Sequence, residues 1–301
     1  MARLEMQNLR TSVDGYAVSA TLHLAGTPHP GSPLLVALHG GTFTSEYFCI
    51  AGSGTGSFVD IATRNGFSVL RMDRPGYGAS DLLPEDDNTF VRQAELLDSA
   101  IAGMLDDCAA DTVVLVGHSI GGIVALEIAA RQPHWRLTGV AISGTGAAIP
   151  AGGAAEQLGA LPFSGVVDLP VEEREQLWYG PASSVSAAAI VSARSSFAPA
   201  PMIELKSAPK WAAQRLDEAA LAITVPVHHT IAEFDALWDA SPSARDLFLA
   251  KFSPTLPVHS EIMTGVGHCI DHHLLGAALH YNQLAFAHQC MLAQMASSNP
   301  F

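Results

Sequence analysis

The chain has 301 residues, a formal net charge of −14, and 49% hydrophobic residues. This length and hydrophobic fraction fit one large α/β domain that carries an insertion. The acidic balance argues against nucleic acid and against anionic membrane surfaces as partners, and it favours a small-molecule ligand. The N-terminal residues lack the apolar stretch of a signal peptide, and no apolar run reaches membrane-spanning length, so we expect a cytoplasmic protein.

The cysteines are few and far apart. Cys49, Cys108, Cys269 and Cys290 form no CxxC pair. This spacing predicts free thiols rather than a disulfide framework or a thiolate zinc site.

The first half of the chain alternates between strand-like and helix-like runs, a pattern typical of βαβ units in a largely parallel sheet. It predicts strands that end at about Leu38 and about Met72, and a further strand within residues 137–144. Helices are predicted within residues 56–66 and 89–108. The strand ends send glycine-rich or polar loops to one edge of the sheet, where open α/β sheets bind their ligands.

The alternation stops in residues 147–220, which are rich in Ala, Pro and Ser. Helical fragments are predicted at residues 171–178 and 183–197. We expect this segment to form a helical lid between two core segments, residues 1–146 and 221–301. A loosely packed connector is the alternative, although so long a structureless loop is unusual in a compact chain.

Residues 113–132, VVLVGHSIGGIVALEIAARQ, read as a buried strand that passes into a helix with almost no loop. Ser119 lies at the joint. So sharp a turn forces its central residue toward positive φ and requires small neighbours such as Gly117 and Gly121. This is the GxSxG nucleophile elbow, which presents a serine hydroxyl at a helix N-terminus. We expect the adjacent His118 to have a structural role.

A nucleophilic serine needs a histidine as its base, and the histidine needs a carboxylate to orient it. In an elbow topology the acid and then the histidine follow later in the chain, each after a strand. The run VPVHHTIAEFD ends in Glu233 and Asp235, and VHSEIMTGVGHC contains a glycine turn followed by His268. These three residues are the candidates.

The segments LHGG, DRPGYGASD, VGHSIGG, VPVHHTIAEFD and TGVGHC occur in the order and spacing of the α/β-hydrolase fold superfamily, which the chain resembles over nearly its whole length. The resemblance implies an α/β fold with a mostly parallel eight-stranded sheet, flanking helices and a helical lid after the sixth strand. It also implies Ser119 as nucleophile, Asp235 as acid and His268 as base. Ala232 stands where the family usually has glycine, and Glu233 is the alternative acid.

Acyl transfer also requires hydrogen-bond donors for the oxyanion. One donor is expected to be the amide of Ile120, at the start of the helix after the elbow. By the resemblance, the second comes from the loop HGGTF, where we favour the amide of Gly41, with Thr42 next. His39 is expected to brace this loop.

Thirteen histidines suggest a metal site, but their spacing argues against one. His228 and His229 are adjacent in a predicted strand and should point to opposite faces. In the cluster His268, His272 and His273, His268 is already the proposed catalytic base and is not free to bind a metal. We therefore predict no metal site.

Aromatic residues of the predicted lid, together with two that follow the glycine loop, are candidates for the substrate pocket. We expect one or two of them to contact the substrate. The candidates are Phe43, Phe48, Phe163, Trp178, Tyr179, Phe197 and Trp211.

The resemblance implies a serine esterase, lactonase or thioesterase that cleaves a small to medium, moderately apolar substrate through an acyl-enzyme, without a cofactor. Alternatives with the same triad are carbon-carbon bond hydrolysis, acyl transfer and perhydrolysis. Family members that cleave carbon-carbon bonds often have tryptophan after the catalytic histidine, whereas Cys269 follows His268 here. A small-molecule receptor on a hydrolase fold is the alternative from another class. The oligomeric state is left open.

Overall fold

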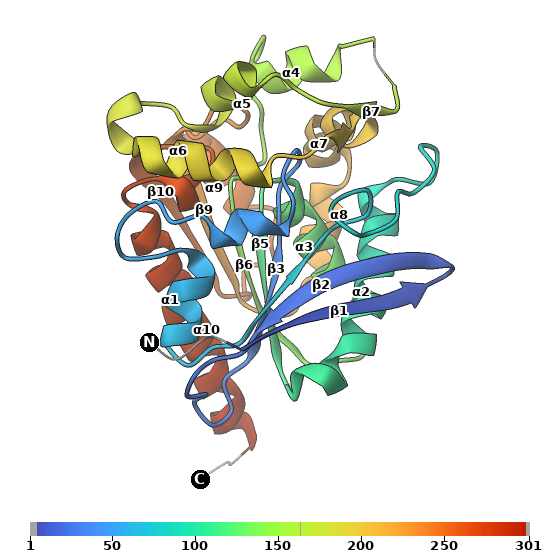
Figure 1. Cartoon of the computed structure of the whole chain (residues 1–301), viewed down its shortest axis with the longest axis vertical. Helices are drawn as coiled ribbons and strands as arrows, with labels where there is room; N and C mark the ends of the chain where they lie inside the picture. The colour runs from blue at the N-terminus through green and yellow to red at the C-terminus, as the bar shows by residue number, and fades with distance from the viewer. Residues whose placement is uncertain (1–4, 163, 299–301) are drawn as a thin grey trace.

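A central sheet of eight strands forms the middle layer of the computed structural model, which describes residues 5–162 and 164–298 (Figure 1). The strand order is β1-β2-β4-β3-β5-β6-β9-β10. β2 is antiparallel to both of its neighbours, and the other neighbouring strands pair in parallel. The strands are β1 (Met6–Val13), β2 (Tyr16–His23), β3 (Leu34–Leu38), β4 (Val69–Met72), β5 (Val113–His118), β6 (Leu137–Ser143), β9 (Val227–Phe234) and β10 (Val258–Gly267).

Helices cover both faces of this sheet. Along β3, Leu34 and Val36 belong to the hydrophobic cluster that packs against α2 and α3, whereas Leu35 and Ala37 belong to the cluster on the opposite face. This alternation follows from the two-residue period of a strand. Since both of its faces are covered, β3 is apolar throughout. The flanking helices are α1 (Phe58–Arg64), α2 (Phe90–Cys108), α3 (Ile120–Ala130), α8 (Leu216–Ala222), α9 (Pro242–Leu249) and α10 (Gly276–Ser298).

The predicted helices begin and end at recognisable signals. Ser57 caps α1 in a reciprocal arrangement with Asp60, and Gly66 follows the helix with φ of +81°. Thr89 caps α2 by accepting a hydrogen bond from the amide of Arg92. In the described part of the chain, no helix is both long and apolar enough to cross a membrane.

The segment between β6 and β9 leaves the sheet and lies over the carboxyl ends of the central strands (Figure 1, yellow and light green). We call residues 147–215 the cap. The predicted boundary at residue 220 falls inside α8, whose Leu216 and Ala219 belong to the main core cluster beside α3. The cap contains α4 (Ala154–Gly159), α5 (Val171–Trp178), α6 (Ala187–Ala193), α7 (Met202–Gln214) and the two short strands β7 (Val166–Val167) and β8 (Ala200–Pro201).

Candidate active site

Ser119 lies at the turn between β5 and α3, with φ of +54° and ψ of −123°. Non-glycine residues rarely adopt positive φ, so this backbone is strained, as the elbow motif predicts. A Cβ atom on Gly117 would lie 2.6 Å from the carbonyl oxygen of Gly121. A Cβ atom on Gly121 would lie 2.0 Å from the carbonyl oxygen of Leu38. Close packing of strand against helix therefore excludes side chains at both glycines.

His268 and Asp235 approach Ser119 from the ends of two neighbouring parallel strands, β10 and β9. His268 Nδ1 lies 2.7 Å from Asp235 Oδ2, and His268 Nε2 lies 3.0 Å from Ser119 Oγ. The other carboxylate oxygen of Asp235 accepts hydrogen bonds from the amides of Leu237 at 2.9 Å and Trp238 at 3.0 Å. Because the carboxylate faces Nδ1, that nitrogen carries the hydrogen, and Nε2 can accept from the serine hydroxyl.

Glu233, the alternative acid, does not reach this group. Its side chain is exposed, and its Oε2 accepts a hydrogen bond from the amide of Gly265 at 2.8 Å. Ala232 is fully buried and packs with Val266 and Ile270, so the position where the family usually has glycine is filled by core packing. Of the two candidate acids, the structure brings Asp235 to the histidine.

The loop after β3 is held by His39, as its sequence predicts. Burial, with a smaller contribution from Arg74, lowers the pKa of His39 to about 3, so its imidazole is neutral near pH 7. Its Nε2 accepts a hydrogen bond from the amide of Arg74 at 3.1 Å. Its Nδ1 therefore carries the hydrogen and donates to the carbonyl oxygen of Gly40 at 2.7 Å.

Gly41 and Thr42 continue this loop over the beginning of α3. A Cβ atom on Gly41 would lie 3.0 Å from Ile120 Cδ1, so the loop and the helix start are in close contact. Thr42 has φ of +65°, and its amide donates to the Tyr77 hydroxyl at 3.4 Å. The Thr42 hydroxyl is buried and has no hydrogen-bond partner within the described part of the chain. Thus the Thr42 amide is engaged, whereas its hydroxyl is available.

A narrow pocket with a volume of about 50 Å³ opens beside Ser119, and Gly41, Thr42 and Ile120 also line it. Among the described residues that line this pocket, none carries a charge. Core residues Leu237 and Trp238 form one wall. The cap supplies apolar side chains that include Leu158, Leu169, Leu177, Trp178, Leu205 and Ala208.

Of the aromatic candidates for the substrate pocket, Trp178 lines it, and four others pack elsewhere. These four are Phe43, Phe48, Phe197 and Trp211. The Trp211 indole donates to Glu127 Oε1 at 2.6 Å, so its polar end is used to join α7 to α3. These four candidates therefore do not line the pocket beside Ser119, and Trp178 is the one aromatic candidate among the described residues that does.

The buried Phe43 contacts the partly buried Phe197 edge to face at a centroid distance of 5.3 Å, so these rings pack against one another and do not line the pocket. Tyr179 is also packed away from the pocket, with its hydroxyl 3.3 Å from His272 Nδ1. Phe163 lies outside the described residues.

His118 faces away from the serine hydroxyl, in agreement with a structural role. Its Nδ1 lies 3.2 Å from Ser143 Oγ, and its ring stacks on Tyr47 at a centroid distance of 4.5 Å. Burial, together with the neighbouring His268, holds the pKa of His118 well below its usual value. Cys269 Sγ lies 3.8 Å from His118 Nε2, and burial raises the pKa of this thiol, so it is a packed, unreactive group.

Asp271 is a buried carboxylate close to His268 in the chain, and it was not among the residues predicted from the sequence. Its oxygens lie 2.8 Å from the Tyr47 hydroxyl and 3.2 Å from His280 Nε2. Burial alone would raise the pKa of Asp271, but the hydrogen bond from His280 and nearby imidazoles hold it below its usual value. Since Tyr47 is 224 residues from Asp271 in the sequence, no local spacing could have indicated their contact.

The adjacent histidines of β9 lie in different surroundings, as alternation along a strand predicts. The His229 ring stacks on Phe248 at 4.1 Å, whereas the His228 ring lies 5.3 Å from the ring of His259. Within residues 5–162 and 164–298, no three or more histidine, cysteine, aspartate or glutamate side chains are grouped so that they could hold a metal ion.

The sheet topology, with a serine at the β5–α3 turn and polar side chains at the ends of β9 and β10, defines an α/β-hydrolase type of fold. The sequence model described as the alpha/beta hydrolase family matches residues 35–277. The chain therefore belongs to the alpha/beta hydrolase family.

Sequence relatives with hydrolase names match part of the chain. It is 30% identical over 127 residues to the uncharacterized hydrolase YugF of Bacillus subtilis, which covers 42% of this chain and 40% of YugF. It is 29% identical over 132 residues to a 2-hydroxy-6-oxo-6-phenylhexa-2,4-dienoate hydrolase of Comamonas testosteroni. This match covers 44% of this chain and 41% of the Comamonas hydrolase. The chain thus spans about two fifths of the length of these curated relatives.

Solved structures match over almost the whole chain. A mutant of the N-acyl homoserine lactonase AidH, complexed with N-hexanoyl homoserine, superposes with a TM-score of 0.66 at 14% identity, over 95% of this chain and 98% of that chain. The carboxylesterase CesB of Bacillus subtilis gives a TM-score of 0.66 at 16% identity, over 94% of this chain and 92% of the CesB chain. At these identities the likeness shows the fold.

Proposed function

We propose that the protein is a serine hydrolase that cleaves a carboxylic ester, lactone or thioester of a small to medium, moderately apolar substrate through an acyl-enzyme. The observation that carries this proposal is the hydrogen-bonded series from Ser119 Oγ to His268 at 3.0 Å and from His268 to Asp235 at 2.7 Å. This series opens on an uncharged pocket. Membership of the alpha/beta hydrolase family and the hydrolase names of its relatives support hydrolysis as the reaction class.

In the first step, Ser119 Oγ attacks the carbonyl carbon of the substrate while its proton passes to His268 Nε2. The carbonyl π electrons move to the oxygen, which becomes an oxyanion, and Asp235 stabilises the imidazolium. The amides of Gly41 and Ile120 are the proposed oxyanion donors, and the Thr42 hydroxyl is a further available donor.

In the second step, the bond between the carbonyl carbon and the leaving group breaks, and His268 gives its proton to the departing alcohol or thiol. The acyl group is now on Ser119. Water then loses a proton to His268 as it attacks the acyl carbonyl, and the carbon-serine bond breaks as Ser119 regains its proton. The substrate, water, Ser119 and His268 account for every bond and proton in these steps, so the proposed reaction needs no cofactor.

The pocket favours a neutral substrate. Among its described lining residues there is no lysine or arginine that could pair with a carboxylate. Burying an unpaired carboxylate is costly. The dienoate in the name of the Comamonas relative carries such a group. A neutral ester, lactone or thioester therefore fits this pocket better than an anionic substrate of carbon-carbon bond hydrolysis, and Cys269 after His268 agrees with this ranking.

We also propose that the cap acts as the lid of this site. Leu158, Leu169 and Leu177 of the cap line the same pocket as Ser119, so the cap encloses the place where the substrate would bind. The same proposal divides the chain into a first core segment, a lid and a second core segment. It also includes a small molecule as the partner and the cytoplasm as the location.

Turnover of p-nitrophenyl acetate and butyrate, together with labelling by a fluorophosphonate, tests the function. We expect wild type to hydrolyse at least one ester and to be labelled, and Ser119→Ala to lose labelling and at least about 10⁴-fold in kcat. Ser243→Ala, at an exposed position on α9, is the matched control and should behave as wild type. A folded wild-type sample that neither turns over nor becomes labelled would support a small-molecule receptor instead.

A further inference from the structure

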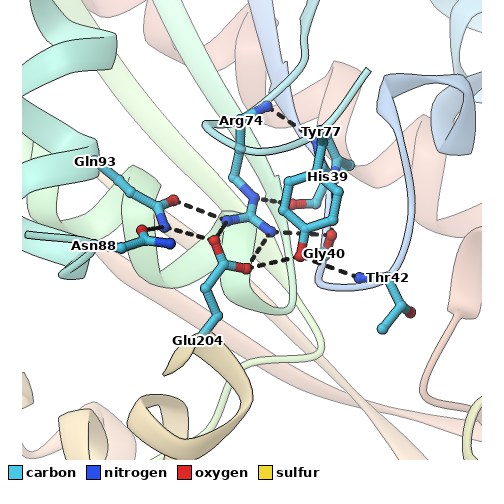
Figure 2. A network of polar contacts seen from close by, with 8 residues as sticks. All are labelled: His39, Gly40, Thr42, Arg74, Tyr77, Asn88, Gln93 and Glu204. Atoms are coloured by element: carbon cyan, nitrogen blue, oxygen red, sulfur yellow. Dashed lines mark hydrogen bonds and ion pairs between the residues drawn. The ribbon is translucent and has the colours of Figure 1, made fainter. Parts of the chain in front are cut away.

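A buried ion pair joins the cap to the loop that precedes the proposed oxyanion donor Gly41 (Figure 2). Arg74 follows β4 in the core, Glu204 lies in the first turn of α7 in the cap, and both side chains are fully buried. Replacing a buried ion pair with apolar residues is often neutral for stability. A contribution to folding therefore does not by itself account for this pair.

All five N–H donors of Arg74 have acceptors. Nε donates to the carbonyl oxygen of His39 at 2.8 Å, and Nη2 donates to that of Gly40 at 3.2 Å. Nη1 donates to Gln93 Oε1 at 2.8 Å and to Glu204 Oε1 at 2.9 Å, and Nη2 also donates to Glu204 Oε2 at 3.1 Å. The guanidinium thus holds two successive carbonyl groups of the loop on one side and the cap carboxylate on the other.

The Glu204 carboxylate has a second connection to the loop, through Tyr77. Gln93 Nε2 donates to Glu204 Oε1 at 2.6 Å, and the Tyr77 hydroxyl donates to Oε2 at 2.9 Å. Burial and the nearby Glu204 raise the pKa of Tyr77, so the phenol keeps its proton and its oxygen can accept from the Thr42 amide. Figure 2 shows that Glu204 is connected to His39 through Arg74 and to Thr42 through Tyr77, and so to both ends of this segment.

The cap contacts the same segment through its backbone. The Thr42 carbonyl oxygen accepts from the amide of Ala198 at 2.9 Å and from Arg174 Nη1 at 3.2 Å. The Thr44 amide donates to the carbonyl oxygen of Ser196 at 2.8 Å. These bonds surround Thr42, whose positive φ is unfavourable for a non-glycine residue and therefore needs such support.

The position of Glu204 also relates the loop to the pocket. Its neighbour Leu205 lines the pocket, and Leu205 Cδ2 lies 3.4 Å from where a Cβ atom on Gly41 would be. The same turn of α7 therefore contacts the substrate space and holds the loop.

We propose that Glu204 is a positioning residue of the cap, which holds the segment from His39 to Thr42 through Arg74 and Tyr77. The Gly41 amide then faces the pocket in the geometry required of an oxyanion donor only while α7 is docked. This inference rests on the proposed function, because it assigns the loop a task in acyl transfer. Docking of the cap thus completes the oxyanion site as well as enclosing the substrate.

The test compares Glu204→Gln and Tyr77→Phe with Glu127→Gln. Glu127 is a matched control because it is also a buried carboxylate that joins the core to α7, through Trp211 and Arg215, without contacting the loop. Three quantities are measured: kcat and KM for p-nitrophenyl butyrate, the inhibition constant of a trifluoromethyl ketone that forms a tetrahedral adduct, and the thermal unfolding midpoint.

For Glu204→Gln and Tyr77→Phe we expect kcat to fall about 10- to 100-fold with KM changed less than about threefold, because misplaced donors lose contact mainly in the transition state. The inhibition constant should rise by the same factor as kcat/KM falls. Glu127→Gln should lower the unfolding midpoint but leave kcat and the inhibition constant within about twofold of wild type, since it touches no oxyanion donor.

The inference is overturned if Glu204→Gln and Tyr77→Phe change only the unfolding midpoint, or if they raise KM and leave kcat unchanged. Should Glu204→Gln fail to fold, Tyr77→Phe decides the question, because it retains the ion pair and removes only the hydroxyl between Glu204 and Thr42. Lack of both hydrolysis and fluorophosphonate labelling in wild type is a different result, which removes the proposed function and this inference with it.

Discussion

The core supplies the proposed reactive groups and part of the pocket lining, whereas the cap supplies apolar lining alone among the described residues. From the core come the hydroxyl, imidazole and carboxylate of Ser119, His268 and Asp235, each placed at the end of a strand. From the cap come mainly leucine, alanine and tryptophan side chains on short helices. The proposed reaction therefore depends on the core, whereas the range of substrates that reach Ser119 depends on the cap.

The two regions also differ in how they are held. Parallel pairing fixes the strand ends of the core relative to one another. The cap has two short strands and several short helices, and buried polar contacts such as Arg74 with Glu204 join it to the core. Substitutions in the core should therefore act on the chemical step, and substitutions in the cap should act on selectivity, with Glu204 as the proposed exception.

The largest effect in this comparison is expected for the core carboxylate. Asp235→Asn should lower kcat about 10³- to 10⁴-fold, because an amide in this place no longer holds the imidazole in the reactive tautomer. Glu233→Gln is the matched control and should stay within about twofold of wild type, because the Glu233 side chain is exposed and bonded to Gly265. Steady-state ester hydrolysis measures kcat of both variants. Equal losses in the two variants would contradict the assignment of the acid.

An intermediate effect is expected in the cap. Ala208→Phe would fill part of the pocket, and it should lower kcat/KM for a butyrate or hexanoate ester at least about 10-fold relative to acetate. Ala213→Phe makes the same change at an exposed position of α7 and should leave this ratio unchanged. If both variants lower hydrolysis of all three esters equally, the cap does not select the acyl chain.

The smallest effect concerns stability of the core in acid. Burial lowers the pKa of His229 from 6.5 to about 4. The unfolded chain therefore binds this proton more readily, and stability is lost as pH falls from about 6.5 to 4, by on the order of 1–3 kcal/mol for this histidine. The thermal unfolding midpoint, followed over this window, should fall less steeply in His229→Gln than in wild type.

His134→Gln, at an exposed position, is the control for this pH series. In this variant the thermal unfolding midpoint should fall with pH as steeply as in wild type. A His229→Gln slope that is equal to or steeper than that of wild type would show that this buried imidazole is not a source of the acid sensitivity.

Part of the fold could be predicted because its signals are local. The strand, the turn at Ser119 and the helix after it follow from residue spacing alone, and the structure has them at Val113–His118 and Ile120–Ala130. The hairpin of β1 and β2 was missed, although Asp14 and Gly15 between two alternating runs form a typical two-residue turn and both have positive φ.

The pocket could not be predicted at the same level. Phe43, Phe197 and Trp211 are aromatic, as expected of a substrate pocket, but an aromatic side chain serves equally well in core packing. Phe43 and Trp211 are buried in the core clusters, and Phe197 packs partly buried against one of them. Glu204 gave no signal because it lies on an ordinary cap helix. Its partner Arg74 is 130 residues away in the sequence.

By itself, the sequence determined the elbow serine, the family, and the order in which acid and histidine follow, since strand and helix periods and turn residues act over a few neighbouring positions. Only the tertiary structure decided that Asp235 rather than Glu233 meets His268, which side chains line the pocket, and that a cap carboxylate holds the loop before Gly41. These outcomes depend on contacts between distant segments, which the packing of the whole chain creates and local spacing does not encode.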